Sequence, residues 1–165
     1  MSIKFNADEV FEMAEQMERN GAKFYRKAAE VCSSGDSRQT LLDLAAMEDE
    51  HEKTFASMRA ELTAQETAST VFDPDNQAAL YLQAFADGHV FDVKEEPCDR
   101  LTGREKMEDI LRIAIGLERD SIAFYLGIRA SVPERMGRDK VEAIIQEEMS
   151  HVTLLSNQLR DQQAA

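Results

Sequence analysis

The four-residue pattern Glu-x-x-His occurs twice in this chain, at two places that lie 100 residues apart. The first copy joins Glu48 to His51, and the second joins Glu148 to His151. The same offset also relates Glu18 to Glu118, Arg19 to Arg119, Phe24 to Phe124, and Tyr25 to Tyr125. Each half of the chain therefore carries one Glu on a first segment and a Glu-x-x-His on a second.

Apolar residues at helical spacing predict four helices, over about residues 8–31, 37–61, 103–130 and 138–159. Short turns join them into two antiparallel hairpins, about 8–62 and 104–160. The connection at about 63–103 is long for a compact domain, and we expect it to hold a short helix at about 75–86. Such a crossover along a bundle is typical of ferritin-like folds. The sequence thus predicts one all-α domain over 1–165, a ferritin-like antiparallel four-helix bundle with a long crossover.

The distance of each motif from its turn tests whether the two halves can form one site. Glu18 lies 17 residues before Gly35, and Glu48 lies 13 residues after it. At a rise of roughly 1.5 Å per residue, the two differ in height by about one helical turn. The second half repeats this arrangement, and positions i and i+3 of each Glu-x-x-His face the same way. We therefore expect all six side chains to meet at one level.

Four carboxylates and two imidazoles at one level have the chemistry of a two-metal site. Glutamate is a hard oxygen ligand that can bridge two cations, and histidine adds one nitrogen donor to each metal, a set that suits iron or manganese. Without a cation, four buried carboxylates would repel one another. The alternative is that these residues form the solvated charged faces of helices in an acidic chain.

The repeated residues resemble those of the ferritin-like di-iron carboxylate proteins, and most closely the rubrerythrin-like branch. The resemblance covers about residues 8–62 and 104–160, and it is carried by segments 18–25 and 118–125 with the two Glu-x-x-His motifs. It implies two iron ions as the cofactor, with manganese or zinc as alternatives. The ligands that it implies are Glu18 and His51 for one metal, Glu118 and His151 for the other, and Glu48 and Glu148 as bridges.

The resemblance also implies an activity, which is oxidation of Fe(II) or reduction of peroxide or dioxygen. Two departures from the rubrerythrins change the expectation. Ser121 stands where they carry a further Glu, which makes the site more symmetric. Their terminal iron domain with two C-x-x-C pairs is also missing from these 165 residues. A peroxidase of this kind would need an external electron donor.

Several residues near the motifs have open roles. Tyr25 and Tyr125 lie seven residues after their Glu, on the same helical face, and we predict either a hydrogen bond to a ligand carboxylate, a redox-active neighbour or an ordinary core tyrosine. The repeat does not preserve three acidic neighbours, which are therefore expected to be solvated or to lie behind the ligands: Glu15, Glu50 and Glu147, opposite Ile115, Ser150 and Met47. His89 is expected at the surface, and Cys32 and Cys98 are expected to be inert.

The charge of the chain limits its partners. The formal net charge is −13, which disfavours nucleic acid and anionic membranes. No stretch approaches the roughly 20 apolar residues of a membrane span, and the N-terminal segment lacks an apolar signal core, so a cytoplasmic location is expected. A homodimer is the expected assembly, since two-fold dimers are the commonest oligomers.

Three classes of function stay open at this point. The first is an oxidoreductase of the ferroxidase or peroxidase type. The second is a metal-binding or storage protein without turnover. The third is an assembly component that uses the apolar residues of the crossover, which are Leu80, Tyr81, Leu82, Phe85, Val90 and Phe91.

Overall fold

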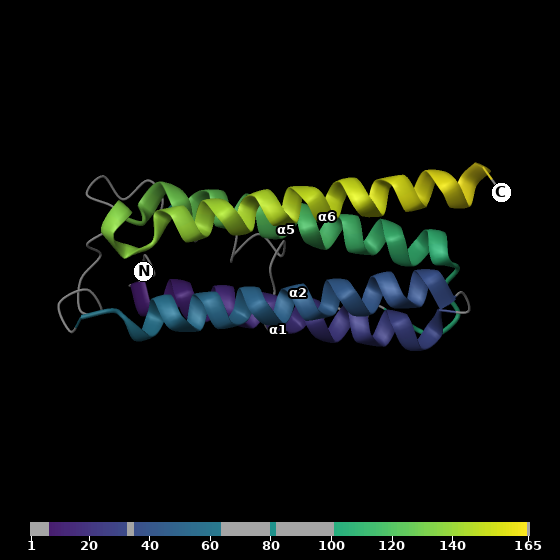
Figure 1. The fold of residues 1–165 in the computed structure, drawn as a ribbon, viewed down its shortest axis with the longest axis horizontal. Helices are drawn as coiled ribbons and strands as arrows, with labels where there is room; N and C mark the ends of the chain where they lie inside the picture. Colours follow the sequence, from purple (N-terminus) through teal and green to yellow (C-terminus); the bar gives the residue numbers. More distant parts are fainter. Residues whose placement is uncertain (1–6, 33–34, 64–79, 82–100, 165) are drawn as a thin grey trace.

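Four long helices, arranged as two antiparallel hairpins, make up most of the described chain (Figure 1). The computed structural model describes residues 7–32, 35–63, 80–81 and 101–164. The helices are α1 (Ala7–Val31), α2 (Gly35–Ala60), α5 (Met107–Ser131) and α6 (Arg138–Ala164), with a short 3-10 helix η2 (Glu134–Met136) before α6. Helices α1 and α2 form one hairpin, and α5 and α6 form the other.

The direction of the helices confirms the predicted ferritin-like bundle. Helix α2 ends at one end of the molecule, whereas α5 begins at the opposite end, so these two helices run the same way (Figure 1). Since α2 has 26 residues and is about 39 Å long, the chain between them has to travel the length of the bundle. Within the predicted short helix at about 75–86, the described residues Leu80 and Tyr81 are helical, and the rest of that segment lies outside the described residues.

The third helix begins at Met107, four residues later than the predicted start at Gly103. Gly103 has a left-handed backbone, with φ of 83°, which a helix does not allow. The Glu105 carboxylate accepts hydrogen bonds from the backbone N–H groups of Thr102, at 2.6 Å, and Gly103, at 3.0 Å. This closed turn delays the helix. The end of the fourth helix also differs from the prediction, since α6 continues to Ala164 instead of stopping near Leu159.

The break between α5 and α6 falls where the sequence predicted it. Helix α5 ends at Ser131, and Pro133 follows in extended conformation before η2. Gly137 then takes a left-handed conformation with φ of 95°, and its N–H donates to the Glu134 carbonyl at 3.2 Å. Because L-residues with a side chain rarely adopt this φ, Gly137 allows the chain to reverse direction tightly.

The apolar core consists of two clusters, one on each side of a polar level in the middle of the bundle. The first cluster contains Val10, Phe11, Ala14, Met17, Phe55, Met58, Phe124, Tyr125, Ile128, Val132, Val141, Ile144 and Ile145. The second contains Phe24, Tyr25, Ala28, Ala29, Leu41, Leu44, Ala45, Leu101, Ile110, Leu111, Ala114, Ile115 and Leu155. Burial of each large side chain contributes roughly 1.5–3 kcal/mol, so these clusters hold the hairpins together and close the level between them.

Candidate metal centre

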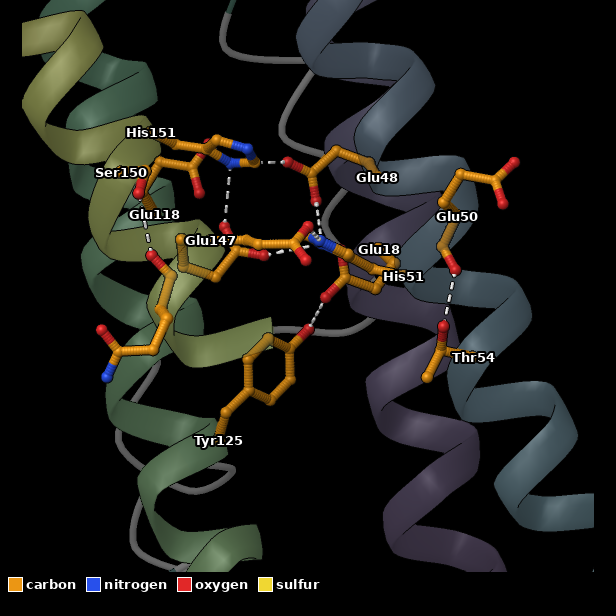
Figure 2. Close-up of polar contacts among 12 residues, drawn as sticks. Glu18, Glu48, Glu50, His51, Thr54, Glu118, Tyr125, Glu147, Ser150 and His151 are labelled. Atoms are coloured by element: carbon orange, nitrogen blue, oxygen red, sulfur yellow. Dashed lines mark hydrogen bonds and ion pairs between the residues drawn. The ribbon is translucent and has the colours of Figure 1, made fainter. Parts of the chain in front are cut away.

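All six residues that the repeat singles out converge at the polar level between the apolar clusters, and Figure 2 labels all of them except Glu148. Each of the four helices contributes to the group, and each residue is at most 5% exposed. The contributors are Glu18 from α1, Glu48 and His51 from α2, Glu118 from α5, and Glu148 and His151 from α6. The alternative of solvated charged faces is therefore wrong for these six residues, although their role as ligands stays a prediction.

Helix geometry explains why each motif delivers two side chains to one place. Residues three apart lie on the same face of a helix, so the Glu and His of each motif point into the bundle together. Glu50, which lies between the Glu and the His of the first motif, differs from them in exposure. Glu50 points away from the cluster and its side chain is 70% exposed, beside Lys53 at 2.5 Å (Figure 2).

The donor atoms form two overlapping groups of four. One group contains Glu18, Glu48, His51 and Glu148, and the other contains Glu48, Glu118, Glu148 and His151. Within each group, one ligand atom from every residue lies within 4.8 Å of the others. Glu48 and Glu148 belong to both groups, so the geometry can accommodate two cations that share these two carboxylates.

Both imidazoles turn the same nitrogen toward the carboxylates. Nδ1 of His51 lies 2.8 Å from Glu148 Oε1 and 3.4 Å from Glu18 Oε2. Nδ1 of His151 lies 3.2 Å from Glu148 Oε2, 3.5 Å from Glu118 Oε1 and 3.6 Å from Glu48 Oε1. The two rings are stacked with their centroids 5.9 Å apart. This common orientation leaves Nε2 of each ring facing away from the four buried carboxylates of the cluster.

Several buried oxygen and nitrogen atoms of these six residues lack a hydrogen bond within the described part of the chain. They are Glu48 Oε1, Glu148 Oε1, His51 Nδ1 and His151 Nε2. The first three face the centre of the cluster. His51 Nδ1 and Glu148 Oε1 are 2.8 Å apart, but they form no hydrogen bond because the angle between the groups is unsuitable. Buried polar atoms without partners are costly. Lone pairs that converge without hydrogen bonds fit a cation between them.

The cluster is electrostatically strained without a cation. Burial raises the pKa of Glu48 well above its usual range, and the charges of Glu18 and Glu148 raise it further. Burial likewise raises the pKa of Glu118 to about 8. Burial lowers the pKa of His151, but hydrogen bonds with Glu118 and Glu148 outweigh this and leave it at about 9. Protons here compensate charge that divalent cations would otherwise neutralise.

The two tyrosines donate hydrogen bonds across the bundle. Tyr25 Oη, on the first hairpin, donates to Glu118 Oε1 on the second. Tyr125 Oη donates to Glu18 Oε1 in the opposite direction (Figure 2). Both side chains are almost fully buried. The predicted hydrogen bond to a carboxylate of the cluster is therefore present for both tyrosines, and both also pack in the apolar clusters as core tyrosines do. Each tyrosine therefore restrains the carboxylate of an outer glutamate, meaning Glu18 or Glu118, which each belong to only one of the two groups.

The three acidic neighbours have three different environments. Glu147 Oε2 lies 2.8 Å from His51 Nε2, although half of its side chain is exposed. Glu15 lies 3.5 Å from Arg59, whereas Glu50 is at the surface. The contact of Glu147 with His51 joins different hairpins, so the sequence repeat could not identify it. The i−1 position relative to Glu148 was the only signal available.

Other predicted residues are placed as follows. Cys32 is half-buried, whereas His89 and Cys98 lie outside the described residues. None of the described helices combines the length and the apolar run that crossing a bilayer requires.

The fold and the cluster together define a ferritin-like helical bundle with a buried carboxylate–imidazole site. The Rubrerythrin family model matches residues 9–159, and this chain belongs to that family. No curated protein matches the chain. Among solved structures, a Thermotoga maritima protein assigned provisionally to the ferritin-like diiron-carboxylate proteins is 23% identical, with a TM-score of 0.69. The match covers 96% of this chain and 97% of that chain, and it shows that the fold is shared.

Proposed function

We propose that this chain is a di-iron carboxylate protein that oxidises Fe(II) or reduces peroxide or dioxygen. The observation that carries the proposal is the pair of overlapping ligand groups that share Glu48 and Glu148 in a buried site. Four carboxylates with two imidazoles suit iron or manganese, and four ionised carboxylates would balance the charge of two divalent ions. Membership of the Rubrerythrin family supports iron over the alternatives.

Each residue has a defined part in this proposal. Glu18 and His51 would hold one metal, Glu118 and His151 the other, and Glu48 and Glu148 would contact both. Bound iron would supply electrons and open coordination positions to the oxidant. The described chain supplies the surroundings: the tyrosines hold the outer carboxylates, and the two apolar clusters limit water at the polar level.

The direct experiment is an anaerobic Fe(II) titration of metal-free protein, followed by peroxide or air, with near-ultraviolet absorbance as the readout. We expect two irons per chain and rapid oxidation, and the faster oxidant indicates the physiological class of reaction. Two bound metals without oxidation would instead favour storage or a structural role. An external electron donor, a homodimer and a cytoplasmic location stay predictions.

The first predicted variant is Glu48→Ala, which removes a carboxylate common to both ligand groups. We expect Fe(II) binding to fall below one equivalent while the helical circular dichroism stays that of the wild type, because the change removes one of several repelling buried acids. Glu50→Ala is the matched control, since Glu50 is on the same helix but solvent-exposed. Two irons per chain in Glu48→Ala would refute the proposed site.

A further inference from the structure

The two histidines of the centre differ in what contacts Nε2, the ring nitrogen that faces away from the four buried carboxylates. His51 Nε2, on the side away from the carboxylates, lies 2.8 Å from Glu147 Oε2 (Figure 2). His151 presents the same nitrogen, but there it is buried and has no hydrogen-bond partner among the residues that the structure describes. The 100-residue offset places Met47 opposite Glu147. A thioether is only a weak acceptor, so the repeat is broken at this position.

This difference matters because an imidazole binds a metal through one nitrogen only. When Nδ1 is the ligand atom, Nε2 carries the proton and needs an acceptor. A carboxylate at that position fixes the tautomer and the ring orientation and makes the ligand nitrogen more basic. Glu147 is such an acceptor for His51, and it reaches across from α6 to a ring on α2.

We propose that Glu147 is a positioning residue for His51 and that it makes the two metal positions unequal, the position at His51 being the tighter. The inference rests on the proposed metal centre. Removal of a carboxylate behind a ligating histidine typically weakens metal binding by about 10–100-fold. Because half of the Glu147 side chain is exposed to water, which weakens the hydrogen bond, we expect an effect of about 10-fold.

Cobalt(II) titrations in two histidine-variant backgrounds test the inference. His151→Ala leaves the group of Glu18, Glu48, His51 and Glu148, and His51→Ala leaves the group that contains His151. We expect Glu147→Gln to weaken cobalt binding about 10-fold in the His151→Ala background and to leave it unchanged in the His51→Ala background. A merely structural role of Glu147 would lower both affinities equally, so the background dependence isolates the contact with His51.

Two further variants complete the design. Glu50→Gln removes the same charge from an exposed position on α2 and is expected to change neither affinity. Met47→Glu supplies a carboxylate at the position equivalent to Glu147. In otherwise wild-type protein, it is expected to strengthen the weaker of the two cobalt-binding steps, so that the two cobalt affinities become more similar. This last measurement needs neither histidine variant, so it holds if either of them fails to fold.

The outcomes separate the inference from the function on which it rests. Two bound cobalt ions in the wild type, with equal effects of Glu147→Gln in both backgrounds or none in either, would overturn the inference and leave the metal centre intact. No cobalt binding by the wild type would overturn both.

Discussion

Each buried glutamate of the centre is unfavourable by itself, because a carboxylate that leaves water loses its hydration. Glu148 is fully buried, and Glu18, Glu48 and Glu118 are almost as enclosed. Their neighbours offset part of this cost: a tyrosine hydroxyl donates to Glu18 and another to Glu118, and the imidazoles approach the shared carboxylates. Such residues make physical sense only as a set, which is why the centre is the strongest functional indication in the molecule.

At the same scale, the ion pair of Asp8 with Arg59 predicts a pH-dependent loss of stability. The Arg59 guanidinium donates to Asp8 Oδ1 at 2.6 Å, and this hydrogen bond holds the pKa of Asp8 below its ordinary value. Stability from this pair is therefore present above the unfolded-state pKa, about 4, and is lost as the pH falls through the lower folded-state pKa. We expect Asp8→Asn to lower the free energy of unfolding at pH 7 by about 0.5 kcal/mol, since Asp8 is partly exposed.

Urea unfolding of Asp8→Asn and wild type at pH 7, 5, 4 and 3 measures this difference, which should shrink toward the acid end. Glu12→Gln is the control, because Glu12 is farther from Arg59, at 3.6 Å, and more exposed. A difference that stays constant across the series would contradict the assignment.

At the scale of elements, the tight connection between α5 and α6 depends on Gly137. Its φ is 95°, and an added Cβ would lie 3.1 Å from Met58 Cε, on the other hairpin. We expect Gly137→Ala to lower the free energy of unfolding by about 1 kcal/mol or more, because a left-handed backbone is unfavourable for alanine and the Met58 side chain has to move. Thermal or urea unfolding measures the effect.

Gly116→Ala is the matched control for this prediction. Gly116 lies inside α5, and an added Cβ would meet nothing within 4 Å. Alanine is the better helix former there, so we expect this variant to be more stable than wild type by about 0.5–1 kcal/mol. If both variants shift stability in the same direction, the conformation of Gly137 is not what limits its replacement.

At the scale of the whole molecule, the candidate centre lies where the two hairpins meet. Each ligand group takes residues from both hairpins, so a bound cation would tie them together. A ligand that binds only the folded chain stabilises it by about 2.7 kcal/mol at 100 times its Kd. For a protein of this size, that corresponds to a rise of about 5–10 °C in the midpoint of thermal unfolding.

We therefore expect saturating Zn²⁺, which avoids redox chemistry, to raise the unfolding midpoint of the wild type by this amount and a chelator to reverse the rise. Glu48→Ala should show little change, because it lacks a carboxylate that both groups use. A scan by circular dichroism or calorimetry is sufficient. An unchanged midpoint in the wild type at saturation would show that the cation does not bridge the hairpins.

The sequence by itself determined the four helices and the six residues of the centre. Both depend on local spacing: apolar periodicity defines each helix, and the i and i+3 positions of Glu-x-x-His share a face whatever the surroundings. The repeat then marked Glu18 and Glu118 as their counterparts, and the distances from the turns placed all six at one height. The apolar periodicity did not predict the late start of α5, because the turn closed by Glu105 depends on side-chain hydrogen bonds.

Only the tertiary structure decided which groups touch across the bundle. Tyr25 donates to Glu118 rather than to a glutamate of its own hairpin, and Glu147 reaches His51 although the repeat offers it no counterpart. Such pairings depend on how each helix is rotated about its axis and on which rotamer fills the space between hairpins. Those quantities are set by packing between residues far apart in the chain, so spacing along the sequence does not contain them.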